Sequence, residues 1–174
     1  VSNLDSRDNI LWPSRGIFAE AQIFLNAPAF GSDFTYSRFS LDIAHYTRLP
    51  WGHIFAHNFV MDFEGGDPPF YQMAMLGGTK KLRGMYEGMF RDRNALIYQV
   101  EYRAPLFWKI GVVGFGGLGN VAPNISDFQL RDTRFAAGGG IRFEVLPKEK
   151  LHLRLDYGRT KGSGGFYLTV GEAF

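Results

Sequence analysis

The residues best suited to acid–base or metal chemistry are four histidines and several carboxylates. Histidine titrates near neutral pH and binds metals, and a carboxylate can orient it or act as a base. The set comprises His45, His53, His57 and His152 with Asp42, Asp62 and Asp156. His53 and His57 share one face of an expected strand, but four residues along a strand span ~13 Å, too far to bind one metal ion. No nucleophile has an obvious base. We therefore expect no enzyme activity, no metal and no cofactor, with a lipid-acting enzyme as the alternative.

A second group of chemically capable residues is the stretch "LGGTKKLRGMYEGMFRDR", residues 76–93. It carries five positive charges, four glycines and two negative charges. A guanidinium that leaves water needs a carboxylate, because an unpaired buried charge is very costly. Glycines let a backbone pass through a crowded interior. The stretch is either a solvated loop, whose "TKK" and "RDR" charges face water or lipid phosphates, or a segment that enters the protein.

The elements that must position these residues are strands. Period-two alternation of apolar and polar residues is typical of strands with one face of each kind. It occurs in 16–24, 36–46, 53–63, 96–106, 109–119, 134–145, 151–158 and 166–174. On the polar face of 151–158 lie His152, Arg154 and Asp156, which predicts a network of charges inside the protein.

The connections between these segments alternate in length. "TRLPWG", "FW" and "LPKEK" are short, whereas the connections after the first, third, fifth and seventh segments are longer. Short turns at one end and long loops at the other describe an outer-membrane barrel. Eight strands of roughly 9–11 residues use about half of the chain. We expect an all-β, eight-stranded antiparallel up-and-down transmembrane barrel, a single domain 1–174 with a tail at 1–15 and a long extracellular loop at 64–95. A soluble barrel is the alternative.

Three tryptophans support a membrane location. Trp12, Trp51 and Trp108 all fall at the short-turn end of the expected meander. Tryptophan favours the membrane–water interface because its ring is apolar and its N–H needs a partner. The three predict an aromatic girdle at that end.

The composition excludes other classes. Net charge is +2 over 174 residues, which gives no argument for nucleic-acid binding. Cysteine is absent, so no disulfide or thiolate site is possible. No run reaches the ~18 apolar residues of a membrane helix. The polar start "VSNLDSRDN" is unlike a signal peptide, and we expect a mature or trimmed chain if the protein is exported.

Several stretches, in order along the chain, resemble the C-terminal half of the barrel of BamA-type outer-membrane assembly factors, the bacterial surface antigen family. They are "DSRDNILWPSRG", "LGGTKKLRGM", "VEYRAPLF", "RLDYG" and "FYLTVGEAF". The second resembles the tip of that family's long sixth loop, written [V/L]-R-G-[F/Y]. The resemblance implies that Leu82, Arg83, Gly84 and Met85 fold into the lumen and that Arg83 meets Glu101 on the wall.

The sequence departs from the family pattern at two positions. Met85 replaces the aromatic residue, and Gly117, in "FGGLG", replaces a second acidic partner. Arg83 then has one carboxylate or finds another among the charges of 36–46, 134–145 and 151–158. The glycines of "GFGGLG" precede no helix, so they predict a curved strand or the close approach of a loop rather than a phosphate site.

The C-terminal segment resembles the signal by which outer-membrane barrels are recognised for insertion. Phe166, Leu168 and Val170 alternate before the terminal aromatic Phe174. The alternative is that the segment simply closes the barrel against 16–24. Because edges must be paired in lipid, we expect self-closure, with a homodimeric barrel or a longer protein carrying periplasmic domains as alternatives.

The function implied is that of a bacterial outer-membrane barrel acting in membrane-protein assembly or protein translocation. A small structural or adhesive barrel without that activity is the alternative. The expected partners are the lipid bilayer and outer-membrane lipids, client outer-membrane proteins, and a second copy in the homodimeric case. No nucleic acid is expected.

Overall fold

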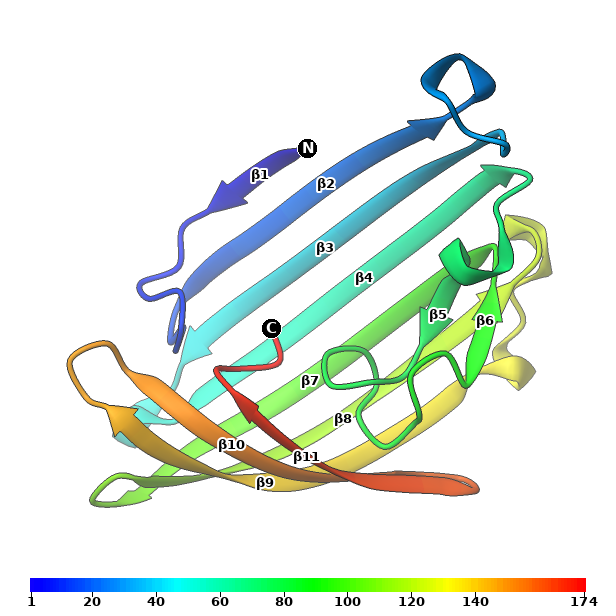
Figure 1. The fold of residues 1–174 in the computed structure, drawn as a ribbon. Coiled ribbons are helices and arrows are strands. Elements are labelled where there is room, and N and C mark those ends of the chain that lie inside the picture. The colour runs from blue at the N-terminus through cyan, green and yellow to red at the C-terminus, as the bar shows by residue number, and fades with distance from the viewer.

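The computed structural model describes residues 1–174 except the side chain of Phe30. One nine-stranded antiparallel sheet follows the order β1-β2-β3-β4-β7-β8-β9-β10-β11. It curves into a trough (Figure 1). The strands are β1 (Ser2–Asp5), β2 (Gly16–Asn26), β3 (Tyr36–Arg48), β4 (Ile54–Gly66), β7 (Asn94–Phe107), β8 (Ile110–Ala122), β9 (Arg134–Leu146), β10 (Leu151–Thr160) and β11 (Ser163–Val170).

The expected all-β antiparallel meander is confirmed. Each of the eight alternating segments contains a strand, and successive long strands pair as neighbours. The polar tail expected at 1–15 contains a further strand, β1, in which Ser2 opposes Ala21 and Asp5 opposes Phe18 of β2. Its four residues carry too short a pattern to be recognised in the sequence.

The sheet is not closed into the expected eight-stranded barrel. β1 and β11 are its two edges, and no pairing joins them in the part of the chain that the structure describes. The chain leaves the sheet after Val170 because Gly171 adopts a left-handed conformation with φ 80°. The Gly171 N–H donates to the carbonyl oxygen of His152 at 2.9 Å, and the last residues turn to the concave side of the trough.

The two ends of the sheet differ in their connections. At the turn end lie residues 49–53, 108–109 and 147–150; at the loop end lie 27–35, 67–93, 123–133 and 161–162. The connection at 161–162 is a two-residue hairpin, so the longer loop expected after the seventh segment is wrong. Short 3-10 helices occupy several connections: Pro28–Phe30, Pro50–Gly52, Phe70–Gln72, Ile125–Asp127 and Leu130–Asp132.

The loop expected at 64–95 has structure of its own. It contains a small hairpin of β5 (Ala74–Leu76) and β6 (Phe90–Asp92), which lies on the concave side of the trough over β7 and β8 (Figure 1). Apolar loop residues pack on the wall in one cluster, formed by Val60, Ala74, Leu76, Leu82, Met85, Ala95, Ile97 and Ala136. The loop is therefore part of the core.

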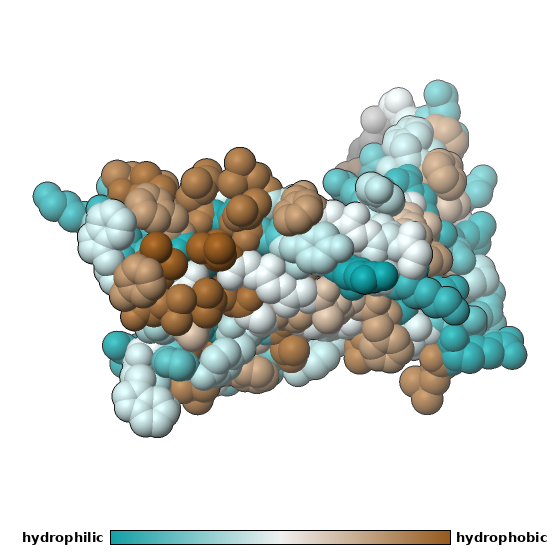
Figure 2. Space-filling model, turned by 90° about the horizontal axis from the view of Figure 1, so that it is seen from below, coloured by the Kyte–Doolittle hydropathy of each residue, from teal (hydrophilic) through white to brown (hydrophobic). Residues whose placement is uncertain are grey.

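The convex, outer face is apolar toward the turn end. Exposed large apolar side chains there come from alternate positions, for example Ile141 and Phe143 of β9 and Leu153 and Leu155 of β10. Figure 2 shows hydrophobic side chains gathered at the turn end, on the left, and hydrophilic ones toward the loop end. No helix of the described chain is long and apolar enough to cross a membrane.

Candidate functional site

The tip of the long loop is buried on the concave side of the trough. Leu82 and Met85 are 1% exposed and Arg83 is 2% exposed, so the solvated-loop alternative does not hold. Leu82 takes a left-handed conformation with φ 56°, which turns the chain so that the next residue points at the wall. The sequence motif therefore places a guanidinium in the interior.

Arg83 meets two carboxylates there. Its Nη2 donates to Glu101 of β7, and its Nη1 donates to Oδ2 of Asp156 of β10 at 2.5 Å. Its guanidinium also lies over the ring of Phe115 of β8, 3.7 Å from the centroid. Charge-assisted hydrogen bonds to two carboxylates and a cation–π contact hold the loop tip from three strands at once.

Asp156 takes the place of the second acidic partner, which the family pattern has at the position of Gly117. A Cβ at Gly117 would lie 2.9 Å from Cδ2 of Leu82, so the loop tip itself occupies the space that a larger residue would need. The second carboxylate comes instead from β10, on the polar face expected to form a charge network. The loop thus keeps two acidic partners by using a different strand.

The two carboxylates belong to a larger network of buried charges. Four arginines meet three carboxylates, and each of these side chains is at most 3% exposed. Nε of Arg103 lies 2.6 Å from Glu101, and Nη1 of Arg142 lies 2.5 Å from Asp156. The members are Arg83, Arg103, Arg142, Arg154, Glu101, Asp156 and Glu172. Removing one member of such a network leaves its partners buried and uncompensated.

Backbone groups of the loop tip are also held by the wall. The Leu82 N–H donates to Oε1 of Gln99 at 2.9 Å, and the Gln99 amide donates to the Lys80 carbonyl at 2.9 Å. On the opposite side, the Gly84 N–H donates to the hydroxyl of Tyr167 at 2.8 Å. The wall therefore holds the loop tip through the Arg83 side chain and also through the main chain at Lys80, Leu82 and Gly84.

Two glycines allow this close approach. Gly84 has φ 113°, a conformation that other residues rarely adopt. Gly158 of β10 faces it, and a Cβ on Gly158 would lie 2.7 Å from the Gly84 nitrogen. The loop backbone and the strand backbone are in contact, as the glycine-rich sequence predicted for a loop approaching the wall.

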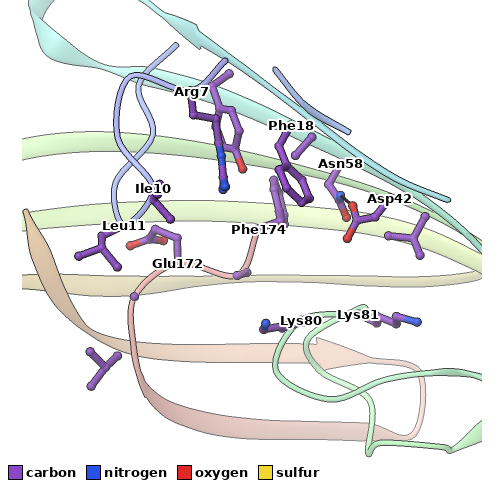
Figure 3. A pocket seen from close by; sticks show the side chains of 16 residues that line it. Arg7, Ile10, Leu11, Phe18, Asp42, Asn58, Lys80, Lys81, Glu172 and Phe174 are labelled. Atoms are coloured by element: carbon purple, nitrogen blue, oxygen red, sulfur yellow. Dashed lines mark hydrogen bonds between the residues drawn. The ribbon is translucent and has the colours of Figure 1, made fainter. Parts of the chain in front are cut away.

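The C-terminal residues lie in the interior, beside a cavity of about 440 Å³ (Figure 3). Phe174 packs, as Phe18 does, against the cluster of Ala44, Tyr46 and Ala56. Both carboxylate oxygens of Glu172 accept hydrogen bonds from Nε of Arg142 at 3.0 Å. Phe166, Leu168 and Val170 instead project outward, with 76%, 67% and 63% exposure. The expectation that Phe174 continues their strand is therefore wrong; the turn at Gly171 carries it inside.

The tryptophans separate into two groups. Trp51 and Trp108, in turns at the same end of the sheet, are 89% and 79% exposed, as an interfacial girdle requires. Trp12 instead stacks on His152 with centroids 4.0 Å apart and lies 5.2 Å from the Arg103 guanidinium. The expected place of Trp12 in the girdle is wrong, because its ring closes the turn end of the interior.

The histidines are not brought to the aspartates. His45 and His57 hydrogen-bond to each other at 2.9 Å on the outer face, whereas Asp42 and Asp62 point inward, toward Asn58 and Lys81. His53 contacts Tyr102, also on the outer face, and Nδ1 of His152 donates to the Lys150 carbonyl. In the described chain, no group of three or more His, Cys, Asp or Glu side chains is placed to hold a metal.

Sequence reasoning did not assign several members of the site. Arg103, Arg142, Glu172 and Tyr167 were not singled out, although Arg103 shares the polar face of its strand with Glu101. Alternation gives the face of each residue and could have found Arg103 and Arg142. It could not find Glu172, which lies beyond the last strand.

Comparison with known proteins gives the family and the fold. The Omp85 superfamily domain matches residues 2–174. The crystal structure of BamA from Haemophilus ducreyi lacking POTRA domains 1–3 matches 97% of this chain with a TM-score of 0.75 and 17% identity. The chain covers 41% of that BamA chain, about two fifths of its length. No curated protein gave a significant match. The expected resemblance to a BamA-type barrel is thus confirmed, and the chain belongs to the Omp85 superfamily.

Proposed function

We propose that this chain is the loop-bearing part of a bacterial outer-membrane β-barrel that assembles or translocates other outer-membrane proteins. The observation that carries the proposal is the buried Arg83, which the loop tip brings to Glu101 and Asp156. A loop that only covered a barrel would not need an arginine, two carboxylates and facing glycines inside it. The docked loop gives the interior a fixed surface, and a client strand can bind beside it.

The unpaired edges support the same function. β1 and β11 each present a free row of backbone groups in the described chain, and open sheet edges are not tolerated in lipid. We propose that further strands complete the barrel in the membrane, from a second copy or from a longer polypeptide. A barrel that opens along such an edge offers a template on which a client strand can pair.

The direct test is the insertion of a client barrel into liposomes that contain the complete protein. We expect faster folding of the client than in empty liposomes, and we expect Arg83→Ala to lose most of that acceleration. Lys81→Gln, two residues away on the same loop, is the matched control and should retain it. If the unaltered protein gives no acceleration, the assembly function fails and the structural or adhesive alternative stands.

The state of the edges can be tested separately with cysteines, since the chain has none of its own. Leu4→Cys in β1 and Leu168→Cys in β11 are combined in one chain and oxidised in the membrane. A disulfide within one chain would show that the nine-stranded sheet closes on itself through β1 and β11, and a disulfide-linked dimer would show a homodimeric barrel. We expect neither bond where a longer polypeptide supplies the missing strands.

The proposal includes no enzymatic step and no cofactor. The sheet separates His45 and His57 on the outer face from Asp42 and Asp62 on the inner face. His152 lies on the inner face, where its Nδ1 donates to the Lys150 carbonyl. Release of fatty acid from an ester-lipid panel by the purified protein, lost in His57→Ala, would overturn this part.

A further inference from the structure

We propose that the outer face of β7–β9 binds lipid A, the phosphorylated and acylated disaccharide of the outer leaflet, with one acyl chain in an apolar hollow and a phosphate on Arg159. The proposal rests on the outer-membrane location proposed above. It concerns the convex face, opposite the docked loop, and is independent of any client.

The hollow lies on the outer face and has a volume of about 540 Å³, within the roughly 300–1,000 Å³ range of ligand pockets. Gly116 of β8 and Ala137 of β9, paired in register, form its floor. Larger apolar side chains surround them, from Tyr98, Val100, Leu118 and Phe135. The shape and lining suit a hydrocarbon chain.

The backbone does not require a glycine at the floor of the hollow. A Cβ on Gly116 would meet only Ala136 O at 3.7 Å and Ala137 Cβ at 3.9 Å, which are ordinary contacts. This differs from Gly117, where a Cβ would lie 2.9 Å from the loop residue Leu82. The absence of a side chain at Gly116 therefore creates the hollow on the outer surface and is not needed to make room for the docked loop.

Arg159 provides the charge at this hollow. It is exposed on the outer face of β10, next to the two-residue hairpin at the loop end, and it opposes Ala137 in register. The arginines of the interior are paired with carboxylates, whereas Arg159 has no ion pair or side-chain hydrogen bond within the described residues. A guanidinium facing the membrane needs an anion, and arginine binds phosphate well.

The position favours lipid A over an inner-leaflet phospholipid. Arg159 is at the loop end of the sheet, which lies at the outer leaflet if the loop at 64–95 is extracellular as expected, and Lys161 follows in the hairpin. Lipid A carries phosphate groups beside several acyl chains, so one molecule can meet both features. Gly84 of the docked loop packs behind the Arg159 backbone, where a Cβ on Gly84 would lie 2.6 Å from the Arg159 nitrogen, and this fixes the residue from the inner side.

The test is native mass spectrometry of the complete protein, extracted from cells in mild detergent and titrated with lipid A, phosphatidylglycerol or phosphatidylcholine. We expect retention of lipid A over both phospholipids. Arg159→Gln should weaken retention about tenfold, the loss of a charge-assisted hydrogen bond to phosphate, and Gly116→Leu should weaken it by filling the hollow. Gly114→Leu, on the same strand and outer face with nothing within 4 Å of its Cβ, is the matched control and should bind as the unaltered protein does.

Several outcomes would overturn the proposal. They are equal retention of phosphatidylglycerol, no effect of Arg159→Gln, or equal losses in Gly116→Leu and Gly114→Leu. Fractionation of the same cells separates this site from the proposed function. A protein absent from the outer membrane contradicts the location, whereas a protein present there without selective lipid A retention contradicts only the lipid site.

Discussion

The two walls of the trough hold the long loop very differently. The wall of β7–β11 supplies Glu101, Phe115, Asp156 and Tyr167 to the loop tip. The hydrogen bonds of Arg83 with Glu101 and Asp156 are buried. The wall of β2–β4 meets the loop through the apolar contact of Val60 and through Lys81, whose Nζ lies 2.6 Å from Asp62 at 35% side-chain exposure. The cavity of about 440 Å³ lies on this second side (Figure 3).

This difference between the two walls shows how one loop can be fixed on one side and border a cavity on the other. The buried charge network ties the tip to β7–β11, and Glu172 extends that network to the C-terminal residues through Arg142. The β2–β4 side keeps a weaker, partly solvated contact. A change near the network should therefore loosen the loop and the C-terminal turn together, whereas a change at Lys81 should loosen neither.

The largest effect is expected from Arg83→Ala. The substitution leaves Glu101 and Asp156 buried near one another without the guanidinium that joins them, and we expect a loss of about 3–5 kcal/mol in the free energy of unfolding. Urea unfolding in micelles, followed by tryptophan fluorescence, measures it. Arg83→Lys should recover only part of the loss, since an ammonium cannot span two carboxylates as a guanidinium does. Full recovery would mean that charge alone anchors the loop.

A smaller effect is expected from Gly158→Val, which disturbs the contact between β10 and the loop tip without removing a charge. The side chain would press on the Gly84 backbone, and we expect a cost of about 1–3 kcal/mol in the free energy of unfolding. Exposure of the loop to a protease that cleaves at Lys80 and Lys81 should rise in parallel. Gly114→Val, with nothing within 4 Å of its Cβ, is the control; equal losses would show that strand glycines matter for the sheet rather than for the loop.

Residues within the strands were easier to predict from the sequence than residues outside them. Period-two alternation alone assigns Glu101, Arg103 and Asp156 to the polar faces of their strands, because the period of a strand is fixed by its geometry. Which of them meets Arg83 depends on curvature and register across four strands, which alternation does not contain. For that reason the sequence left Asp156 as one of several possible second partners of Arg83.

Residues outside the strands were harder to predict. Trp12 was predicted at the girdle because it precedes 16–24, and Phe174 was predicted as the end of the strand 166–174. The local backbone turns each of them inward, at the 6–15 turn and at Gly171. The same limit applies to closure. Alternation predicts strands but not whether the first and last of them pair, and here the four-residue β1 and the early end of β11 leave the edges apart.

A still smaller effect is expected from Lys81→Gln, which tests the weaker side of the comparison. Its ion pair with Asp62 is partly exposed, and such pairs contribute roughly 0–1 kcal/mol to the free energy of unfolding. Raising the salt concentration should destabilise the unaltered protein more than Lys81→Gln, because the variant lacks this one partly exposed pair. A loss as large as that of Arg83→Ala would contradict the view that the loop is held mainly by the β7–β11 wall.

The smallest effect is expected at the turn between β1 and β2, at the far edge of the weaker wall. Burial acts to raise the pKa of Asp8, but hydrogen bonds from the Ser14 hydroxyl at 2.5 Å and from the Ser14 and Arg15 N–H groups outweigh it and lower the pKa below its usual value. A lowered pKa in the folded state means that the turn is stabilised at pH values above the unfolded-state pKa of about 3.9 and loses that contribution as pH falls through the folded pKa. Because Ser14 lies two residues from Trp12, fluorescence of Trp12 alone, in a Trp51→Phe and Trp108→Phe background, should change as the pH falls below the unfolded-state pKa of about 3.9. Asp8→Asn should abolish the change. If Asp8→Asn shows a fluorescence change of the same size, the change belongs to other carboxylates. The hydrogen bonds of Asp8 would then not stabilise this edge of the sheet.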